Sequence, residues 1–204
     1  MIRPDARPGA HRIVLTGGPG GGKTTAADLF RREIGDRVVI VPEVATLLFT
    51  GGFPRVDQPH ARRSAQQAIY HVQRNLEDVQ AARFPDRTLL CDRGTVDGAV
   101  YWPTDGSYFT AVGSSLEAEL ARYDAVIFFE SAALGGMSIE GGNPARIEDE
   151  REAVALDHAL RDLWSRHPSY FFVPHNPSFL AKITFGLAAL RSVLEDLERG
   201  RPPG

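Results

Sequence analysis

The stretch that most constrains this chain is residues 17–24, whose sequence GGPGGGKT fits the pattern G-x-x-x-x-G-K-[ST]. A short apolar run at 12–16 precedes it, and a helix-favouring run at 25–32 follows it. Glycines let successive backbone N–H groups turn inward, and the first turn of a helix adds unpaired donors. The stretch therefore predicts a polyphosphate-binding loop between a strand and a helix, in preference to a glycine-rich turn with an incidental lysine.

The same pattern assigns roles inside this phosphate-binding loop. Lys23 is expected to reach the β- and γ-phosphates of a nucleotide as a catalytic residue. Thr24 is expected to be a ligand of Mg²⁺. The residues expected to contact the nucleotide are Gly18, Pro19, Gly20, Gly21, Gly22, Lys23, Thr24 and Thr25.

Alternation of apolar runs with helical patterns predicts the fold class. Five runs are predicted to be strands, at 12–16, 38–41, 88–91, 125–129 and 170–173. Helices are predicted at 25–32, 61–83, 116–122, 147–166 and 178–198, with irregular segments at 50–60 and 95–107. The apolar runs are continuous, as in strands that are buried on both faces. The chain is therefore expected to form an α/β fold, with helices on both sides of a parallel sheet.

Two of the predicted helices carry apolar stripes with steps of three or four residues. In the helix at 61–83 the stripe consists of Ala65, Ile69, Val72, Leu76 and Val79. In the helix at 178–198 it consists of Leu180, Ile183, Leu187, Leu190, Leu194 and Leu197. Both stripes are expected to pack in the core, and binding to a partner is the alternative use of the second.

Composition narrows the class of protein. The 204 residues suit one domain, expected at 12–199 between tails at 1–11 and 200–204. A net charge of −3 gives no support for a nucleic-acid-binding surface, and no apolar run is long enough to span a membrane. Cys91 has no second cysteine to pair with, and no secretory signal is found. A cytoplasmic protein that acts on a small molecule is expected, with its oligomeric state open.

Polar residues stand where several predicted strands end, and ligands of open parallel sheets bind beyond those carboxyl ends. Glu43, Asp92, Arg93 and Glu130 are therefore expected to face one crevice beside the phosphate-binding loop. Asp92 is the preferred ligand of Mg²⁺, directly or through water, and Glu130 is its rival because it also follows an apolar run. We prefer Asp92 to Glu130 as the Mg²⁺ ligand because Arg93 follows Asp92 directly, and a cation at that position suits an anionic substrate.

Two sequence features favour phosphoryl transfer to a small acceptor over hydrolysis. The residue after Asp92 is Arg93, which cannot act as a base to activate water. The chain also has no Asn-Lys-x-Asp string of the kind that reads guanine. Glu43 is expected to accept the proton of an acceptor hydroxyl or to orient that hydroxyl. The alternative role for Glu43 is to stabilise a helix N-terminus.

The segment at about 131–151 is predicted to be a mobile lid, because it contains two glycine pairs. Arg146, as a catalytic residue, and Arg151, as a substrate contact, are expected to approach the transferring phosphate when this lid closes. The alternative is a surface loop whose arginines are solvated.

Residues after Gly94 are candidates for substrate contacts. Asp97 could bind a sugar hydroxyl, and the aromatic ring of Tyr101 could stack on a base or pyridine ring. Trp102 and Tyr108 are further aromatic candidates in the same segment. The alternative is that these residues fill the core under a loop.

These motifs together resemble a known family. The phosphate-binding loop, VPEVA at 41–45, DRGTVDG at 92–98 and the segment with Arg146 are similar to the P-loop domain of the ribosylnicotinamide kinase module of NAD regulators. This domain type is often labelled AAA and is close to nucleoside and thymidylate kinases. The resemblance implies a three-layer P-loop NTPase fold, with a five-stranded parallel sheet in the order 2-3-1-4-5. It also implies ATP and Mg²⁺ as cofactors and Glu43 as the base.

The expected function is transfer of the γ-phosphate of ATP to a hydroxyl of a nucleoside-like or ribosyl small molecule. Members of this domain family are not all ribosylnicotinamide kinases. The alternative is therefore a nucleotide-binding regulatory switch, or an ATPase, without a small-molecule acceptor. The identity of the acceptor and the choice between ATP and GTP stay open.

Overall fold

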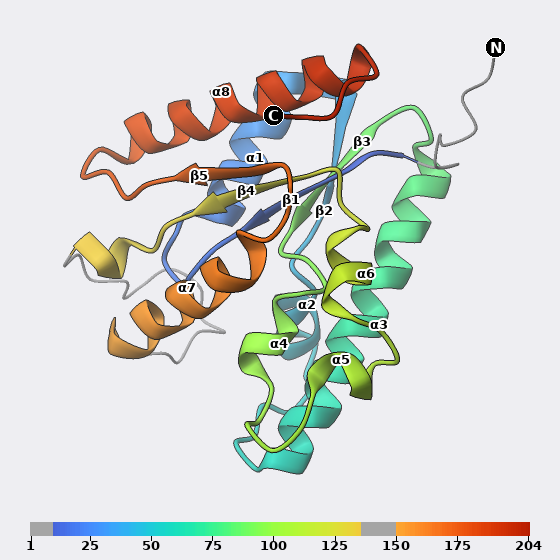
Figure 1. Cartoon of the computed structure of the whole chain (residues 1–204), viewed down its shortest axis with the longest axis vertical. Helices are drawn as coiled ribbons and strands as arrows, with labels where there is room; N and C mark the ends of the chain where they lie inside the picture. Colours follow the sequence, from blue (N-terminus) through green and yellow to red (C-terminus); the bar gives the residue numbers. More distant parts are fainter. Residues whose placement is uncertain (1–9, 136–149) are drawn as a thin grey trace.

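A computed structural model of the chain describes residues 10–135 and 150–204, which form three layers with a sheet in the middle (Figure 1). The strands are β1 (Arg12–Thr16), β2 (Val38–Val41), β3 (Thr88–Asp92), β4 (Ala125–Phe129) and β5 (Tyr170–Val173). Every neighbouring pair runs parallel, and the order is β2-β3-β1-β4-β5. The predicted five-stranded parallel sheet and its order are therefore confirmed.

Side chains of the central strands alternate between the two faces of the sheet. In β1, Ile13 and Leu15 join one buried apolar cluster, whereas Val14 joins another. In β4, Ile127 follows the first pattern and Phe128 the second. Each face therefore needs its own covering layer of helices, which explains why the strands are apolar throughout.

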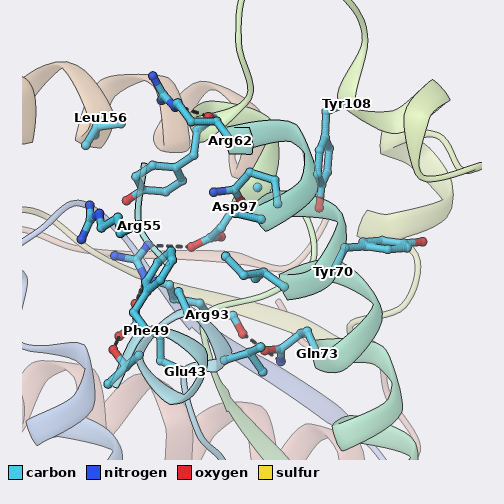
Figure 2. A pocket seen from close by; sticks show the side chains of 18 of the residues that line it. Glu43, Phe49, Arg55, Arg62, Tyr70, Gln73, Arg93, Asp97, Tyr108 and Leu156 are labelled. Atoms are coloured by element: carbon cyan, nitrogen blue, oxygen red, sulfur yellow. Dashed lines mark hydrogen bonds and ion pairs between the residues drawn. The ribbon is translucent and has the colours of Figure 1, made fainter. Parts of the chain in front are cut away.

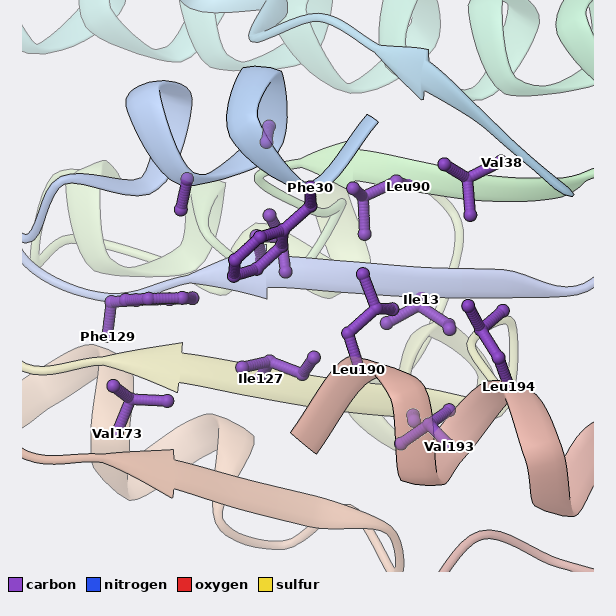
Figure 3. Packing of buried hydrophobic residues seen from close by; sticks show 14 of the residues in the cluster. Ile13, Phe30, Val38, Leu90, Ile127, Phe129, Val173, Leu190, Val193 and Leu194 are labelled. Carbon is purple, nitrogen blue, oxygen red and sulfur yellow. The ribbon is translucent and has the colours of Figure 1, made fainter. Parts of the chain in front are cut away.

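One face of the sheet is covered by α1 (Lys23–Ile34) and α8 (Phe179–Glu198). Figure 3 shows the buried side chains between these helices and the strands, with Leu190 of α8 among them. Gly186 lets α8 approach closely, because a Cβ atom at this position would lie 2.7 Å from the ring of Phe129.

The opposite face is covered by α3 (Pro59–Arg83), α6 (Leu116–Leu120) and α7 (Glu150–Trp164). Trp164 at the end of α7 and Cys91 of β3 are fully buried in the cluster beneath these helices. Burial raises the pKa of the Cys91 thiol well above its ordinary value.

Short elements complete the described fold, and the sequence analysis did not predict the three short α-helices among them. Residues 95–107, predicted to be irregular, contain one of these helices. The short elements are α2 (Val44–Thr50), α4 (Gly98–Tyr101), α5 (Tyr108–Ala111) and the 3₁₀ turns η1 (Gly35–Arg37) and η2 (Ala132–Gly135).

Several predicted helix boundaries need correction. The helix α1 begins at Lys23 rather than at residue 25, so Lys23 and Thr24 belong to its first turn. The helix α3 begins at Pro59, because proline suits the first helical position, where its missing N–H is not needed. The helix α7 ends at Trp164, two residues before its predicted end. Residues 147–149, predicted to start that helix, lie outside the described residues.

The apolar stripe predicted for α3 is only partly correct, because Ala65 is buried whereas two other members are exposed. Val72 is 37% exposed and Val79 is 52% exposed. The side chains that are buried instead include Gln73 and Glu77, and Arg122 donates a hydrogen bond of 2.6 Å to Glu77. Part of this interface is polar, so hydrophobic spacing alone could not find the buried face.

The stripe predicted for α8 is mostly correct, because Ile183, Leu190 and Leu194 are buried in the core. Its first residue, Leu180, is 75% exposed instead, because the helix begins at the edge of the sheet layer. Neither α8 nor any other helix within residues 10–135 and 150–204 is long and apolar enough to cross a membrane.

One residue in each predicted tail makes a hydrogen bond to the described fold. The backbone carbonyl of His11 accepts a hydrogen bond of 2.7 Å from Leu89 N, which places residue 11 at the start of the sheet. At the other end, the carbonyl of Pro203 accepts a hydrogen bond of 2.5 Å from Ser169 Oγ. Pro203 is buried, so this residue packs on the described fold, whereas the other residues of 200–204 are exposed.

Candidate active site

The phosphate-binding loop connects β1 to α1, as the sequence predicted. Gly20 and Gly22 have φ values of 75° and 84°, in the left-handed region that glycine adopts at low cost. Gly17 has a φ of 131°, and a Cβ atom there would lie 2.0 Å from the carbonyl oxygen of Phe129. Glycine is therefore required both for the curl of the loop and for its close approach to β4.

Lys23 and Thr24 lie at the first turn of α1, where backbone N–H groups and the helix dipole favour an anion. Lys23 is buried, and its Nζ donates a hydrogen bond of 2.7 Å to the carbonyl oxygen of Gly18. Its ammonium group is therefore held inside the loop, next to the amides that would face a polyphosphate.

Thr24 and Asp92 form a pair of oxygen donors that fits a magnesium ion. Thr24 Oγ1 donates a hydrogen bond of 2.6 Å to Asp92 Oδ2, whereas Asp92 Oδ1 is buried without a hydrogen-bond partner among the described residues. Burial raises the pKa of Asp92, and the nearby charge of Glu43 adds to this effect. Mg²⁺ commonly takes one or two protein oxygens and completes its shell with water and phosphate oxygens.

Glu130, the rival candidate, lies at the end of β4 and has other partners. Its Oε2 accepts a hydrogen bond of 2.7 Å from the backbone N–H of His175, and Oε1 lies 3.8 Å from Arg161. Asp92 is therefore the strand-end carboxylate that contacts Thr24. Within the described part of the chain, no group of three or more His, Cys, Asp or Glu side chains is placed to hold a metal ion.

Arg93 links two carboxylates at the carboxyl end of β3. Its Nε donates a hydrogen bond of 2.5 Å to Glu43 Oε1, and its Nη1 donates one of 2.8 Å to Asp97 Oδ2. Arg93 has a φ of 70°, which costs about 1–2 kcal/mol for a residue with a Cβ atom. Such strain is commonly found at functional sites, where surrounding contacts maintain it.

Glu43 is ionised in this arrangement. Its burial favours the neutral acid, but the charge of Arg93, a hydrogen bond of 2.6 Å from Thr46 Oγ1 and the charge of Lys23 outweigh this effect. The pKa of Glu43 is lowered to about 2. Glu43 also precedes α2 as its N-cap residue, although its side chain makes no capping hydrogen bond there. Its carboxylate accepts hydrogen bonds from the side chains of Arg93 and Thr46 instead.

Asp97 accepts hydrogen bonds from two elements of the fold, β1 and α7, and from Arg93. Thr16 Oγ1 lies 2.9 Å and Trp164 Nε1 lies 2.7 Å from Asp97 Oδ1. The side chain is only 6% exposed. Asp97 therefore ties β1 and α7 to Arg93, and its contact with a sugar hydroxyl stays a prediction.

A cavity of about 340 Å³ adjoins the phosphate-binding loop, between α2, α3, α4 and α7 (Figure 2). Pro19 of the loop lines it, together with Glu43 and Arg93. Aromatic rings form much of its wall, and the lining aromatic residues are Phe49, Tyr70, Tyr101 and Tyr108. The volume and this mixture of apolar walls with a few charged groups are typical of a small-molecule site.

The hydroxyls of two wall tyrosines, Tyr70 and Tyr108, are hydrogen-bonded to other parts of the protein. Tyr70 OH donates a hydrogen bond of 2.7 Å to Glu119 Oε1, and Tyr108 OH donates one of 2.7 Å to the carbonyl of Thr95. These residues therefore present aromatic surface to a ligand. Gln73 Nε2 donates a hydrogen bond of 3.0 Å to a Glu77 oxygen, so the orientation of this amide is also fixed.

The remaining predicted contacts fall in different places. Tyr101 lines the cavity, and the guanidinium carbon of Arg93 lies 5.9 Å from the centre of its ring. Arg151 is exposed on the first turn of α7. The residues of α7 that line the cavity are Glu152 and others further along the helix. Arg146 and residues 136–149 of the predicted lid lie outside the described residues.

This geometry agrees with a comparison to protein families. Residues 12–177 match a family described as an AAA domain. The chain belongs to this AAA domain family. Its matched segment contains the phosphate-binding loop, Glu43, Asp92 and Arg93. A search of curated proteins finds no match.

Solved structures share the fold of this AAA domain at low sequence identity. Deoxyadenosine kinase from M. mycoides with bound dATP has a TM-score of 0.63 and 15% identity, and the match covers 89% of this chain and 100% of that chain. Thymidylate kinase from Ehrlichia chaffeensis has a TM-score of 0.59 and 15% identity, and the match covers 92% of this chain and 100% of that chain. Shikimate kinase from Acinetobacter baumannii in complex with shikimate has a TM-score of 0.53 and 14% identity, and the match covers 92% of this chain and 94% of that chain. The AAA domain therefore has a P-loop kinase-like fold.

Sequence reasoning missed three side chains that shape this site of the AAA domain. Gln73 and Trp164 were placed only within helices, and Asp157 was not singled out. A signal for Asp157 was available, because it lies at helical spacing from Ala153 and Leu160 and interrupts an apolar stripe.

Proposed function

We propose that this AAA domain protein is a kinase that transfers the γ-phosphate of ATP to a hydroxyl of a nucleoside-like or ribosyl small molecule. The observation that carries the proposal is the position of Glu43. This ionised carboxylate lines a ligand-sized cavity, and Arg93 joins it to the residues next to the phosphate-binding loop. A phosphate donor in the loop and an acceptor in the cavity would thus meet at Glu43.

The nucleotide side of the proposed site consists of the loop amides, Lys23, Thr24 and Asp92. Lys23 is proposed to leave the carbonyl of Gly18 and to bind the β- and γ-phosphate oxygens. Thr24 and Asp92 are proposed to hold Mg²⁺, which neutralises charge on the phosphates when it is bound. The buried and unpartnered oxygen of Asp92 supports this assignment.

The acceptor side consists of Glu43, Arg93 and the cavity wall. Glu43 is proposed to orient the acceptor hydroxyl and to receive its proton at a carboxylate oxygen. A pKa of about 2 makes it a weak base, which suits a loose transition state that needs positioning more than proton abstraction. Tyr101 is proposed to stack on the acceptor, and Asp97 to hold Arg93 and contact a sugar hydroxyl. Arg146 and Arg151 are proposed to neutralise the transferring phosphate.

A screen of acceptors with labelled ATP and Mg²⁺ tests this proposal. Nucleosides and ribosides are supplied one at a time, and ADP release and labelled product are measured. ADP release that depends on the presence of one class of acceptor would support the kinase proposal. The Lys23→Ala variant is expected to lose transfer by at least about 10²-fold, because a donor to the transferring phosphate is removed.

Two other outcomes would contradict the kinase proposal. Tight nucleotide binding without acceptor-dependent release across the whole screen would favour a nucleotide-binding switch. ADP release at the same rate with and without acceptors would favour an ATPase. A Lys23→Ala variant that phosphorylates the acceptor at the parent rate would remove Lys23 from the proposed site.

A further inference from the structure

Asp157 is a buried carboxylate in the middle of an otherwise apolar helix face. The other members of this face of α7 are Ala153, Leu160 and Trp164, and all four residues are 0% exposed. Placing a carboxylate among apolar side chains costs free energy unless hydrogen bonds or charges compensate it. The bonds that compensate Asp157 come from the phosphate-binding loop and from the end of β4.

A single oxygen of Asp157 holds two backbone segments together. Its Oδ1 accepts hydrogen bonds of 2.8 Å from Gly18 N and of 2.8 Å from Ser131 N. The hydroxyl of Ser131 donates in turn to the carbonyl oxygen of Pro19. Two successive residues of the phosphate-binding loop are therefore tied, directly or through Ser131, to Asp157.

The fit between Asp157 and the loop is close. A Cβ atom at Gly18 would lie 2.6 Å from Asp157 Oδ1, so glycine is needed for this contact. On the other side of the same residue, Lys23 Nζ donates to the carbonyl oxygen of Gly18. The N–H and the carbonyl oxygen of Gly18 are thus held by two different side chains, Asp157 and Lys23.

We propose that Asp157 is a positioning residue of the phosphate-binding loop. It fixes Gly18 through its N–H, so that the other amides of the loop are preformed for the triphosphate of Mg²⁺–ATP, while the Gly18 carbonyl holds Lys23 until the nucleotide binds. Preformed donors bind an anion more tightly than donors that must first be ordered. This inference rests on the proposed nucleotide binding. It predicts an effect on nucleotide affinity that loss of α7 packing alone does not produce.

The test is the dissociation constant of a fluorescent ATP analogue in the presence of Mg²⁺, measured with the full chain. Asp157→Ala removes both backbone hydrogen bonds and is expected to weaken binding about tenfold. Asp157→Asn keeps a side-chain oxygen that can accept both bonds, so its dissociation constant is expected to stay within about threefold of the parent value. The asparagine variant also tests the inference if the alanine variant does not fold.

Two variants of the same helix serve as controls. Leu160→Ala loosens the packing of α7 without touching the loop, and it is expected to lower the thermal midpoint while the dissociation constant stays unchanged. Asp162→Ala removes an exposed carboxylate of α7 and is expected to change neither quantity.

The outcomes separate this inference from the kinase proposal. Parent-like binding by Asp157→Ala would overturn the inference alone, as would binding by Asp157→Asn that is tenfold weaker. A tenfold loss in Leu160→Ala would also overturn it, because the effect would then belong to packing. Absence of nucleotide binding by the parent chain would overturn both proposals.

Discussion

Glu43 accepts hydrogen bonds from Arg93 and Thr46, so its carboxylate is oriented before any acceptor binds. The same contacts keep it ionised at neutral pH, with a pKa of about 2. Glu43 is therefore proposed to offer a fixed oxygen to an acceptor hydroxyl beside the phosphate-binding loop, and to receive the proton of that hydroxyl during transfer.

The Glu43→Gln variant separates this role from nucleotide binding. Glutamine keeps one acceptor oxygen but cannot receive a proton, so kcat is expected to fall by about 10²-fold or more. The affinity for Mg²⁺–ATP is expected to stay close to the parent value, because the predicted nucleotide contacts are in the loop. Steady-state kinetics and nucleotide titration measure the two quantities. Unchanged turnover would exclude Glu43 as the proton acceptor.

Lys182 of α8 offers a second test at the scale of the residue. It is buried, its Nζ donates a hydrogen bond of 2.5 Å to the carbonyl oxygen of Glu130, and burial lowers its pKa from 10.5 to about 8. Between these values the unfolded chain binds more protons, so stability should rise with pH. From pH 7.5 to 9.5 this group is expected to add about 2 kcal/mol to the free energy of unfolding.

Urea unfolding of the parent chain and of Lys182→Met at both pH values checks this expectation. The methionine variant lacks the titrating group, so its free energy of unfolding should rise less by about 2 kcal/mol. Parallel pH dependences in the two proteins would show that Lys182 does not titrate in this range.

At the scale of the element, Gly186 decides how closely α8 packs on β4. In an exposed helix, a change from glycine to alanine stabilises by about 1 kcal/mol. Here the new Cβ atom would lie 2.7 Å from the Phe129 ring and 3.1 Å from the Phe30 ring. Gly186→Ala is therefore expected to destabilise the fold by about 1–3 kcal/mol, because the rings must shift.

Ala188→Gly is a matched reference, since Ala188 is exposed two residues further along the same helix. It is expected to cost about 1 kcal/mol through helix propensity alone. Urea unfolding of both variants compares the two effects. A stabilised Gly186→Ala variant would show that α8 can move away from β4 without cost.

Elements with strong, regular patterns were predictable, and the strands are the best example. Each strand is a short apolar run because both of its faces are covered. The helix α2 was missed because Val44, Thr46 and Thr50 are β-branched residues with low helix propensity. Part of the buried face of α3 was missed because Gln73 and Glu77 are buried through hydrogen bonds, which apolar spacing does not reveal.

The candidate site was predictable to the extent that its residues follow strand ends or a sequence pattern. Asp92 contacts Thr24 beside the phosphate-binding loop, and the preference for Asp92 over Glu130 as the Mg²⁺ ligand stays a prediction. The ion pairs of Arg93 with Glu43 and Asp97 depend on its left-handed backbone, which no sequence pattern indicates for arginine. Contacts of Asp157 and Trp164 join segments that are far apart in the chain and need the packed fold.

At the scale of the whole molecule, the phosphate-binding loop and the adjoining cavity lie at the carboxyl ends of the strands. Ligand binding at these strand ends should stabilise the entire fold. With Mg²⁺–ATP at 100 times its dissociation constant, linkage adds about 2.7 kcal/mol. For a chain of this length the thermal midpoint is expected to rise by about 5–10 °C.

Thermal unfolding with and without Mg²⁺–ATP measures this shift. Removal of the metal with EDTA is expected to reduce it, because Thr24 and Asp92 then lose their proposed contribution to binding. An identical midpoint under all three conditions would argue against a nucleotide site in the folded state.

The burial of Cys91 has a practical consequence. The chain's single thiol lies in β3 directly before Asp92, between the layers, and its raised pKa keeps it protonated. An alkylating reagent can attack this sulfur only after the centre of the sheet has opened. The rate at which the Cys91 thiol is alkylated therefore measures how often the sheet opens. A bound nucleotide that stabilises the fold should lower this rate.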